Sequence, residues 1–429
     1  MQTHFTADQL ADPQIAEADA ILRNCVHCGF CTATCPTFVI TGDERDSPRG
    51  RIWMLREVLE SPETVSANTS YHIDRCLGCL SCTTTCPSGV DYPHLLDIGR
   101  AKLDKLVPRR FADKMMRRLL GMIIPYAGRF RMMIALARVG RLFGGSRPTA
   151  WCGALTKMPA ELTPFDRVGS HDAVFSPDNT PVKRVALLAG CAQRALDPEI
   201  NASTIRVLNR LGVEVVVRSE VHCCGALAHH IGETDRAHHT VRAAVLAWYD
   251  EMKSGGLDAI VVNASGCGTM VKDYGHMMKD DAELAGIAKA VSDKCVDISE
   301  LLDNLDVESI LQSVPAEGRG KIAYHSACSL QHGQKIHDLP LRLLRQAGFD
   351  VVQPLNGHLC CGSAGVYNIL QPEMADELKA RKLDSLDKTG AQFVAAGNIG
   401  CITQLNRKDL PVRHTIQFID WATGGPNPR

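Results

Sequence analysis

The chain reads CVHCGFCTATCP at residues 25–36 and CLGCLSCTTTCP at residues 76–87. Both stretches have the form CxxCxxCxxxCP. Three thiolates spaced two residues apart can wrap a loop around three corners of an iron–sulfur cube, and the fourth thiolate then faces away from that loop. The proline that follows breaks the local helix and turns the fourth cysteine outward. The two runs therefore predict two tetranuclear iron–sulfur clusters within the first hundred residues.

The expected ligands follow from the way two-cluster ferredoxins share their cysteines. In such proteins the last cysteine of each run ligates the other cluster. The predicted sets are Cys25, Cys28, Cys31 and Cys86 for one cluster, and Cys76, Cys79, Cys82 and Cys35 for the second. Gly29 and Gly78 fit loops that approach a cluster closely with positive φ. A pair of zinc sites is the alternative, but zinc pairs favour two CxxC halves separated by a longer loop.

A helix is expected between the two runs. Residues 49–60 (RGRIWMLREVLE) carry apolar side chains at helical spacing, namely Ile52, Leu55, Val58 and Leu59. This suggests the helical variety of two-cluster ferredoxin domain, of the kind seen in the iron–sulfur subunits of succinate dehydrogenases. Arg45, Arg49 and Arg51 are expected at the solvated surface, with compensation of the anionic clusters as the alternative reading.

Length and composition indicate the class of protein. A chain of 429 residues suggests two or three domains, and its net charge of -1 gives no case for nucleic acid. Its 18 cysteines would suggest disulfides in a small secreted protein, but the N-terminus has acidic residues and no apolar core typical of a signal peptide. No uncharged apolar run approaches the roughly 18 residues of a membrane span. We therefore expect free thiols that bind metal in a cytoplasmic protein, with attachment to the inner face of the cell membrane left open.

A basic connector follows the ferredoxin-like region. Residues 101–147 hold twelve Lys or Arg and two Asp, a net of +10, so the rest of the chain carries about -11. Two amphipathic helices are expected here, the second around residues 130–143. A basic amphipathic helix can lie on anionic lipid. Packing helices with a solvated basic face, or a docking surface for an acidic partner, are the alternatives and are together slightly favoured.

From about residue 183 the sequence alternates between strand and helix, and the pattern then repeats. Cys191, Cys223 and Cys224 recur 137 residues later as Cys328, Cys360 and Cys361. Cys267 recurs 134 residues later as Cys401. Such offsets indicate a duplication. The first and last cysteines of each half are expected to end strands, and a Cys-Cys-Gly turn follows another strand. Because open α/β sheets place ligands at the carboxyl ends of their strands, the four thiols of each half can converge.

The eight repeat cysteines are the tentative ligands of at least one further metal cluster: Cys191, Cys223, Cys224, Cys267, Cys328, Cys360, Cys361 and Cys401. Zinc and a redox-active vicinal dithiol are the alternatives. Four histidines lie near them in the sequence and are expected to be hydrogen-bonding neighbours more often than ligands: His222, His325, His332 and His358. Cys152 and Cys295 lie outside both patterns and are expected to be buried or incidental thiols.

The two repeats resemble the cysteine-rich (CCG) domain of heterodisulfide reductases and related subunits. The full family pattern has CxxC where this chain has Ala264 to Cys267 and Asn398 to Cys401. One thiol per repeat is missing, which speaks against a non-cubane cluster that needs five thiols. The expected fold class is α+β multidomain, with a helical two-cluster ferredoxin-like domain (residues 1–100), the connector (101–180), and a duplicated α/β CCG domain (181–305 and 306–429).

Over nearly its whole length the chain resembles the iron–sulfur subunit of bacterial glycolate oxidase. The passages that carry the resemblance are DSPRGRIWML, NASGCG, HGQ after Cys328, and GNIGC. The resemblance implies partner subunits that contain FAD and oxidise glycolate to glyoxylate, and a quinone or another membrane acceptor for the electrons. No GxGxxG, P-loop or Ser-His-Asp pattern is present in a suitable context, so no residue of this chain is assigned a catalytic role.

Three rival functions remain at this point. The same architecture serves anaerobic glycerol-3-phosphate dehydrogenase and lactate-utilisation proteins, and the order of domains does not separate them. A heterodisulfide reductase-like thiol/disulfide catalyst is the second rival, against which the missing fifth thiol counts. A zinc-stabilised scaffold is the third.

Overall fold

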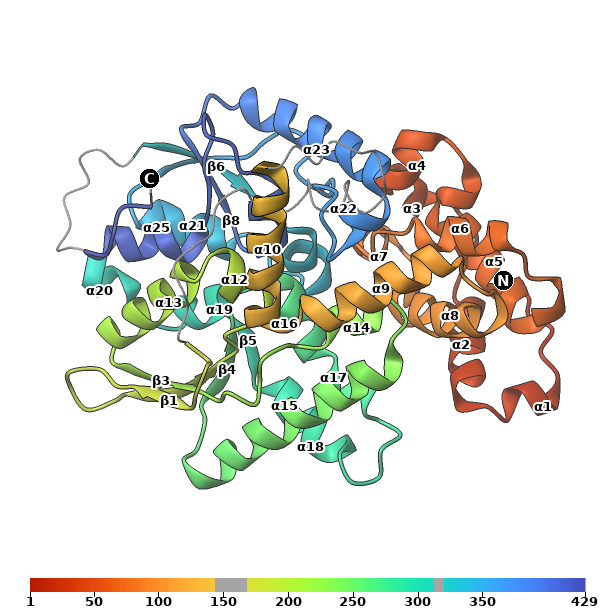
Figure 1. Cartoon of the computed structure of the whole chain (residues 1–429), viewed down its shortest axis with the longest axis horizontal. Coiled ribbons are helices and arrows are strands. Elements are labelled where there is room, and N and C mark those ends of the chain that lie inside the picture. Colours follow the sequence, from red (N-terminus) through yellow and green to blue (C-terminus); the bar gives the residue numbers. More distant parts are fainter. Residues whose placement is uncertain (143–167, 312–319, 429) are drawn as a thin grey trace.

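The computed structural model describes residues 1–142, 168–311 and 320–428. Figure 1 shows the N-terminal helices gathered at one end of the molecule and two α/β units at the other. The N-terminal helices are α1 (Ala7–Leu10), α2 (Pro13–Arg23), α3 (Phe30–Ala33), α4 (Pro36–Thr41), α5 (Pro48–Glu60), α6 (Ala67–Asp74), α7 (Ser81–Thr85) and α8 (Tyr92–Leu106). The expected α+β multidomain class is confirmed, with a helical region before two α/β repeats.

Helix α5 links the two cysteine runs, as the spacing of its apolar residues predicts. Its start is set by Ser47, whose side chain accepts a hydrogen bond from the Gly50 N–H, and by Pro48 in the first turn. Leu55 and Val58 are fully buried against α2 and α8. Gly99 of α8 lets this contact form, since a Cβ there would lie 2.1 Å from Leu55. The ferredoxin-like region is therefore held together by helix packing around the cysteine loops.

The duplication is confirmed in the sheets. The first sheet has the order β1-β3-β2-β4-β5 and the second has the order β7-β6-β8-β9. The strands are β1 (Ala173–Phe175), β2 (Lys183–Leu187), β3 (Val213–Val217), β4 (Ala259–Val262), β5 (Cys295–Asp297), β6 (Lys321–His325), β7 (Asp350–Val352), β8 (Phe393–Ala396) and β9 (Val412–His414). All neighbouring strands are parallel except β1, which pairs antiparallel with β3. Removing β1 leaves two sheets of the same order.

Helices cover both sheets. The helices of the first repeat are α12 (Ala192–Leu196), α13 (Glu199–Arg210), α14 (Ala226–His230), α15 (Thr234–Ser254), α16 (Ser265–Lys272), α17 (Tyr274–Met277), α18 (Ala285–Asp293) and α19 (Ile298–Asp303). The second repeat has the π-helix η3 (Ser329–Gly333) and helices α21 (Leu339–Gln346), α22 (Tyr367–Leu370), α23 (Pro372–Asp387), α24 (Ile399–Leu405) and α25 (Thr415–Ala422), with α20 (Val307–Leu311) before it.

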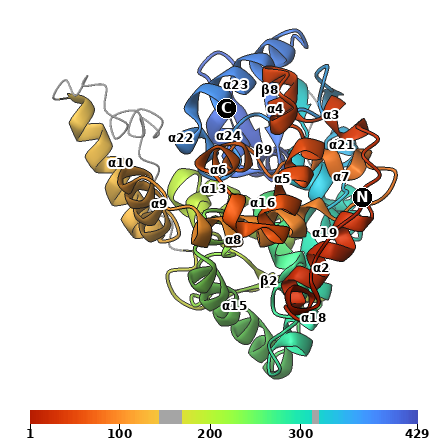
Figure 2. The same ribbon diagram turned by 90° about the vertical axis from the view of Figure 1, so that its right-hand side faces the viewer.

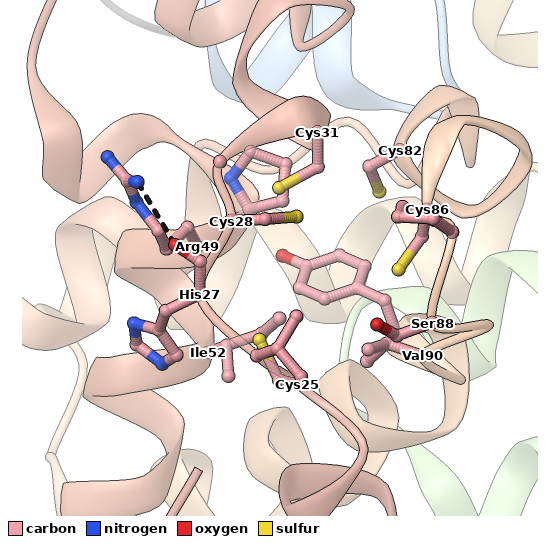
Figure 3. Close-up of a pocket in the computed structure, with 15 residues that line it drawn as sticks. Cys25, His27, Cys28, Cys31, Arg49, Ile52, Cys82, Cys86, Ser88 and Val90 are labelled. Carbon is pink, nitrogen blue, oxygen red and sulfur yellow. Dashed lines mark hydrogen bonds between the residues drawn. The ribbon is translucent and has the colours of Figure 1, made fainter.

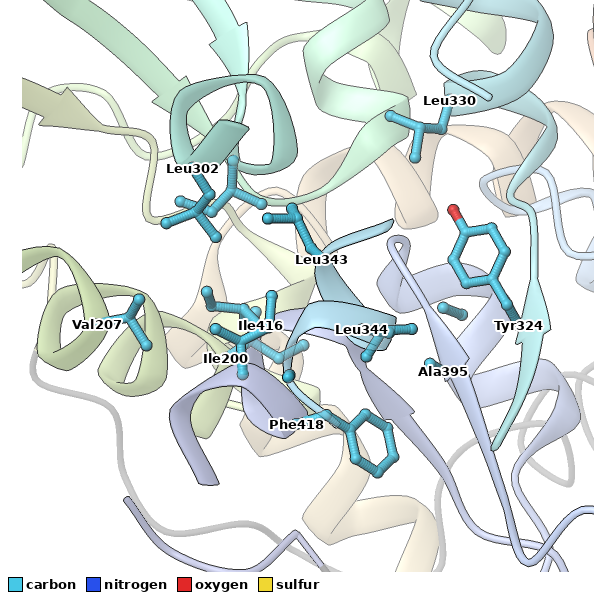
Figure 4. Packing of buried hydrophobic residues seen from close by; sticks show 14 of the residues in the cluster. Ile200, Val207, Leu302, Tyr324, Leu330, Leu343, Leu344, Ala395, Ile416 and Phe418 are labelled. Carbon is cyan, nitrogen blue, oxygen red and sulfur yellow. The ribbon is translucent and has the colours of Figure 1, made fainter. Parts of the chain in front are cut away.

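One apolar core joins the two repeats. Figure 4 shows Ile200 and Val207 of α13 beside Ile416 and Phe418 of α25, with Leu344 of α21 close by. The Ser265 N–H after β4 also donates to the Gly397 carbonyl after β8, at 3.0 Å. The carboxyl ends of two equivalent strands therefore meet, and the repeats form one body.

The connector contains α9 (Phe111–Ile123) and α10 (Ala127–Leu142), which stand out from the body in Figure 2. Strand β1 lies inside the predicted connector, yet it belongs to the first sheet. The domain boundaries at 100, 180 and 305 stay predictions, and Cys152 lies outside the described residues.

No single described helix is long and apolar enough to cross a membrane. Helix α9 with the first part of α10 meets that test by length and composition only, as a pair bent by 120°.

Candidate metal centres

Four sulfurs of the first predicted cluster face one pocket. Cys25, Cys28, Cys31 and Cys86 line it, and so does Cys82 of the second run. Figure 3 shows the side chains of the first three cysteines and of Cys86 directed towards a shared space. We call these four residues set A. Cys25 is buried and Cys28 is exposed, so this set reaches the molecular surface.

The two cysteine loops have the same backbone conformation. The third and fifth residues of each run have positive φ: His27 (56°) and Gly29 (85°) in the first, and Gly78 (63°) and Leu80 (62°) in the second. Positive φ at a non-glycine residue costs roughly 1–2 kcal/mol. His27 and Leu80 adopt it nevertheless, which indicates that the loop is shaped for its ligand set. The positive φ expected at Gly29 and Gly78 is confirmed.

The fourth cysteine of each run turns away from its own loop. Cys35 has φ -78° and ψ 114°, and Cys86 has φ -77° and ψ 114°. The following prolines favour this extended conformation. Burial raises the pKa of the Cys79 thiol, and so do the neighbouring sulfurs of Cys360, Cys82 and Cys35. Cys35 therefore lies with the second loop, as Cys86 lies with the first.

We call Cys35, Cys76, Cys79 and Cys82 set B. A buried arginine lies beside this set. The Arg51 guanidinium is 1% exposed, and its Nη1 lies 3.9 Å from the Cys35 sulfur. Burial opposes a charged thiolate at Cys76, but the positive charges of Arg51 and Arg100 lower the pKa of its thiol. The Tyr92 hydroxyl also donates to the Cys76 sulfur at 3.6 Å. Set B is therefore the more positive of the two environments.

Asp46 holds Arg51 in place. This carboxylate is fully buried and contacts Arg51 at 3.4 Å, the His72 ring at 2.9 Å and Arg75 at 2.9 Å. The expectation that Arg51 lies at the surface is wrong. Arg51, Leu55 and Val58 occupy one face of α5, so the helical spacing itself carries the signal that Arg51 points inward. Arg45 and Arg49 do pair with acidic residues at the surface.

The donor sets suit iron–sulfur clusters. Burial raises the pKa of Cys31 to about 11, and the nearby sulfurs of Cys25 and Cys86 contribute. Burial and the sulfurs of Cys76, Cys35 and Cys31 likewise raise the pKa of Cys82. Four sulfurs confined in this way resist becoming thiolates together unless positive charge is supplied. Metal binding supplies that charge, and thiolates are the ligands that iron–sulfur clusters take.

In each repeat the four cysteines also converge. The sulfurs of Cys191 and Cys223 are 3.6 Å apart, and Cys224 interacts with both Cys223 and Cys267. In the second repeat the sulfurs of Cys328 and Cys360 are 3.8 Å apart, and those of Cys361 and Cys401 are 3.4 Å apart. Two thiolates on one tetrahedral metal ion lie about 3.7 Å apart, given metal–sulfur bonds of about 2.3 Å. Disulfide sulfurs would lie only about 2 Å apart.

These cysteines do not end strands, contrary to expectation. Strand β2 ends at Leu187, four residues before Cys191. Cys267 and Cys401 lie in the first turn of α16 and α24. The carboxyl ends of the strands still direct the chain towards one region, and the cysteines lie in the segments that follow those strands. The glycines of the two Cys-Cys-Gly turns have positive φ, 85° at Gly225 and 86° at Gly362.

The positions of the missing fifth thiols differ between the repeats. Ala264 precedes α16 and offers no ligand atom. Asn398 precedes α24, and its amide donates to the Cys401 sulfur at 3.8 Å. Neither position can replace a thiolate, so each described set has four sulfurs.

Set B adjoins the thiols of the second repeat. Cys79 and Cys328 pack against a small cluster that includes Leu77, Cys360 and Tyr367. Two hydrogen bonds close the contact: Tyr367 donates to the Arg75 carbonyl at 2.9 Å, and the Thr84 hydroxyl lies 2.8 Å from the His332 ring. Sequence reasoning missed this contact, because its partners are more than 240 residues apart.

Two family models match the chain. The family model described as "4Fe-4S dicluster domain" matches residues 21–90. The one described as "Cysteine-rich domain" matches residues 185–272 and 322–406. The chain therefore carries the two 4Fe-4S clusters that were predicted and two cysteine-rich domains.

Comparison with known proteins gives full-length relatives. The chain is 40% identical to the "Glycolate oxidase iron-sulfur subunit" of Escherichia coli (strain K12), over 98% of this chain and 99% of that one. It is 30% identical to the "Probable glycolate oxidase iron-sulfur subunit" of Bacillus subtilis (strain 168), over 90% of this chain and 88% of that one. It is 27% identical to "Lactate utilization protein A" of Anoxybacillus flavithermus, over 53% of this chain and 94% of that one.

Proposed function

Because this chain belongs to the family of glycolate oxidase iron–sulfur subunits, we propose that it carries electrons for a complex whose FAD-containing partner oxidises glycolate to glyoxylate. Iron–sulfur clusters, when bound, take up and release single electrons. The residues of this chain hold those clusters and supply charges and hydrogen bonds around them. Substrate chemistry is left to the partner, since dense thiolate sets offer no site for hydride transfer.

The observation that carries the proposal is the arrangement of the thiolate sets. Set A reaches the surface at Cys28, and Cys31 of set A lies near Cys82 of set B. Cys79 of set B lies beside Cys360 and Cys328 of the second repeat. Three sets thus adjoin one another from the surface to the interior. A scaffold stabilised by separate zinc ions does not require such a row.

We expect the flavoprotein to dock around Cys28. Val26, Phe30 and Trp53 lie near this exposed cysteine and are 68%, 62% and 46% exposed. Exposed apolar side chains beside a redox site are suited to a partner that must come close to it. We expect Phe30→Glu to weaken the complex about 30-fold, as is typical of an aromatic anchor, in a pull-down or titration with the partner. Leu355→Glu, at another exposed apolar residue, is the matched control.

For the acceptor side we propose contact with the membrane through α9 and α10, with a quinone as the acceptor. Met132, Leu136 and Val139 are exposed along one face of α10, while Phe130, Ile134 and Ala137 are buried on another. Exposed basic residues accompany them, namely Lys114, Arg118 and Arg138. An apolar face with a basic rim suits anionic lipid.

The share of this chain that each relative matches favours glycolate over lactate as the substrate of the complex. The relatives named for glycolate oxidase match at least 90% of this chain, whereas the lactate-utilisation relative matches 53%. That shorter match leaves nearly half of the chain unaccounted for. A thiol/disulfide catalyst of the heterodisulfide type is less well supported, because Ala264 and Asn398 replace its fifth thiols.

Cys79→Ser tests the proposal in the assembled complex. We expect glycolate still to reduce the flavin, while reduction of a quinone acceptor stops. Cys295→Ser is the control, because Cys295 is buried in β5 outside the four sets. Undiminished quinone reduction in the Cys79 variant, with normal complex recovery, would remove the electron-carrying role.

A further inference from the structure

The two cysteine-rich repeats differ at one buried position. His325 is the last residue of β6, three residues before Cys328. The equivalent position before Cys191 is Leu188. Strand register supports this equivalence, because Ile322 pairs with Phe393 as Val185 pairs with Ala259. Both side chains are 1% exposed, so an imidazole replaces a leucine inside the protein.

The His325 imidazole lacks ordinary partners. Within residues 1–142, 168–311 and 320–428, neither ring nitrogen has a hydrogen-bond partner, although both are buried. Burying a polar group without a partner is energetically unfavourable. In the second repeat, therefore, a side chain that is costly to bury has been placed beside the thiols. Such a group points to a ligand that the ring is there to meet.

The ring lies with two of the cysteines. One ring nitrogen of His325 and the sulfurs of Cys361 and Cys401 all lie within 4.8 Å of one another. Thiolate and neutral imidazole are the two ligand types that iron and zinc take together in proteins.

We propose that His325 binds the same iron ion as Cys361 and Cys401, so that the second repeat holds an iron centre of mixed thiolate and imidazole ligation. In the first repeat, Leu188 stands at the equivalent position and has no ligand atom. Iron is inferred because Cys360 of this repeat adjoins Cys79 of set B, and this choice of metal rests on the electron-carrying role proposed above. The ligation itself does not depend on which hydroxy acid the complex oxidises.

Mixed ligation has a physical consequence. An imidazole ligand is neutral, whereas a thiolate is negative, so the centre carries less negative charge than an all-thiolate one. Replacement of two thiolates by histidines raises the potential of Rieske centres in this way. We therefore expect the second repeat to hold electrons more tightly than an all-thiolate centre of the same type.

The test is pulsed EPR on the full chain, purified anaerobically, reduced with dithionite and labelled with ¹⁵N-histidine. The wild type is expected to show a strong coupling from a histidine nitrogen, and His325→Leu, which copies Leu188, is expected to lose it. His358→Ala, two residues before Cys360, is the control and should keep it. Coupling that persists in His325→Leu, or stoichiometric zinc in place of iron at this site, would overturn the proposal.

A second variant, His325→Cys, provides a test in case His325→Leu fails to fold. It keeps a donor at the position, so iron should stay while the nitrogen coupling disappears and the midpoint potential falls. An unchanged potential with iron retained would contradict ligation by His325. Glycolate-dependent turnover of the complex is measured separately. The nitrogen coupling tests ligation by His325, whereas turnover tests the electron-carrying role, so the two proposals can fail independently.

Discussion

A single buried charge distinguishes set B from set A. Arg51 lies 3.9 Å from the Cys35 sulfur and donates to the Thr37 hydroxyl and the His72 carbonyl. In contrast, the arginine beside set A, Arg49, is paired with Glu44 at the surface. Positive charge favours the reduced form of a redox centre, because reduction adds negative charge. On this ground we expect the set B cluster to have the higher midpoint potential of the two.

Arg51→Gln should therefore lower the midpoint potential of the set B cluster. At about 4 Å one charge contributes about 4 kcal/mol at an effective dielectric of 20, so we expect a shift on the order of 100 mV. EPR-monitored redox titration measures it, and Arg45→Gln, at an exposed residue, should leave the potential unchanged. Equal potentials in Arg51→Gln and wild type would show that Arg51 acts only in folding.

The backbone conformation of Gly362, beside Cys360 and Cys361, leads to a second prediction about a single residue. Its φ is 86°, and a Cβ would lie 2.6 Å from the Ala375 carbonyl oxygen. We expect Gly362→Ala to cost about 3 kcal/mol in unfolding free energy and to reduce the metal content of the second repeat, since backbone must move beside Cys360 and Cys361. Gly365 has φ 63° with open space, so Gly365→Ala should cost only about 1 kcal/mol. Equal losses in chemical denaturation would contradict this account.

Helices α9 and α10 were expected from their spacing, and the structure clarifies their basic residues. Arg117 binds Asp113 and Asp74, so it stabilises the fold instead of presenting free charge. Arg118 and the apolar face of α10 remain exposed. Any test of membrane contact should spare Arg117.

Met132→Glu combined with Leu136→Glu should reduce binding to vesicles that contain anionic lipid by at least tenfold. Each exposed apolar side chain contributes roughly 1.5–3 kcal/mol when it is buried, and each new carboxylate is repelled by the lipid. Vesicle sedimentation measures the effect, with Val174→Glu, at an exposed apolar residue of β1, as the control. Failure of the wild type to bind these vesicles would contradict contact of α9 and α10 with the membrane.

Much of the element-scale picture could be predicted from sequence. Both cysteine runs, helix α5 and the duplicated strands follow local rules of spacing and repetition. The contact of Thr84 with His332 could not, because chain order says nothing about which loops meet. Burial of Arg51 and isolation of His325 were missed for a related reason: the environment of a polar side chain depends on distant elements. Both positions nevertheless carry a signal in the sequence: Arg51 falls on the apolar face of its helix, and His325 departs from the repeat.

At the scale of the whole molecule, paired histidines join the ferredoxin-like region to the first repeat. His94 lies 2.7 Å from Asp91 and 3.0 Å from Asp273, and its ring stacks on His276, which bonds Glu17 at 2.7 Å. Burial opposes the charged ring, but hydrogen bonds with Asp273 and Asp91 raise the pKa of His94 to about 10. The contact between domains is therefore sensitive to pH.

His94 should stabilise the fold most at low pH. Since its folded pKa exceeds the unfolded value of about 6.5, its contribution is complete below pH 6.5 and is lost as the pH rises towards 10. We expect His94→Gln to cost about 2 kcal/mol in unfolding free energy at pH 6 and almost nothing near pH 10. Denaturation across this range measures it, and a difference that does not vary with pH would argue against a charged His94.

The central claim is that adjoining thiolate sets of this chain hold iron–sulfur clusters as one electron-carrying row. Its most direct test is iron and acid-labile sulfide analysis of the anaerobically purified chain, combined with the EPR spectrum of its fully reduced form. We predict at least about eight irons per chain, with additional iron from the second repeat, and spectra broadened by magnetic interaction between neighbouring clusters. Zinc without iron, or iron centres with no magnetic interaction, would contradict the account.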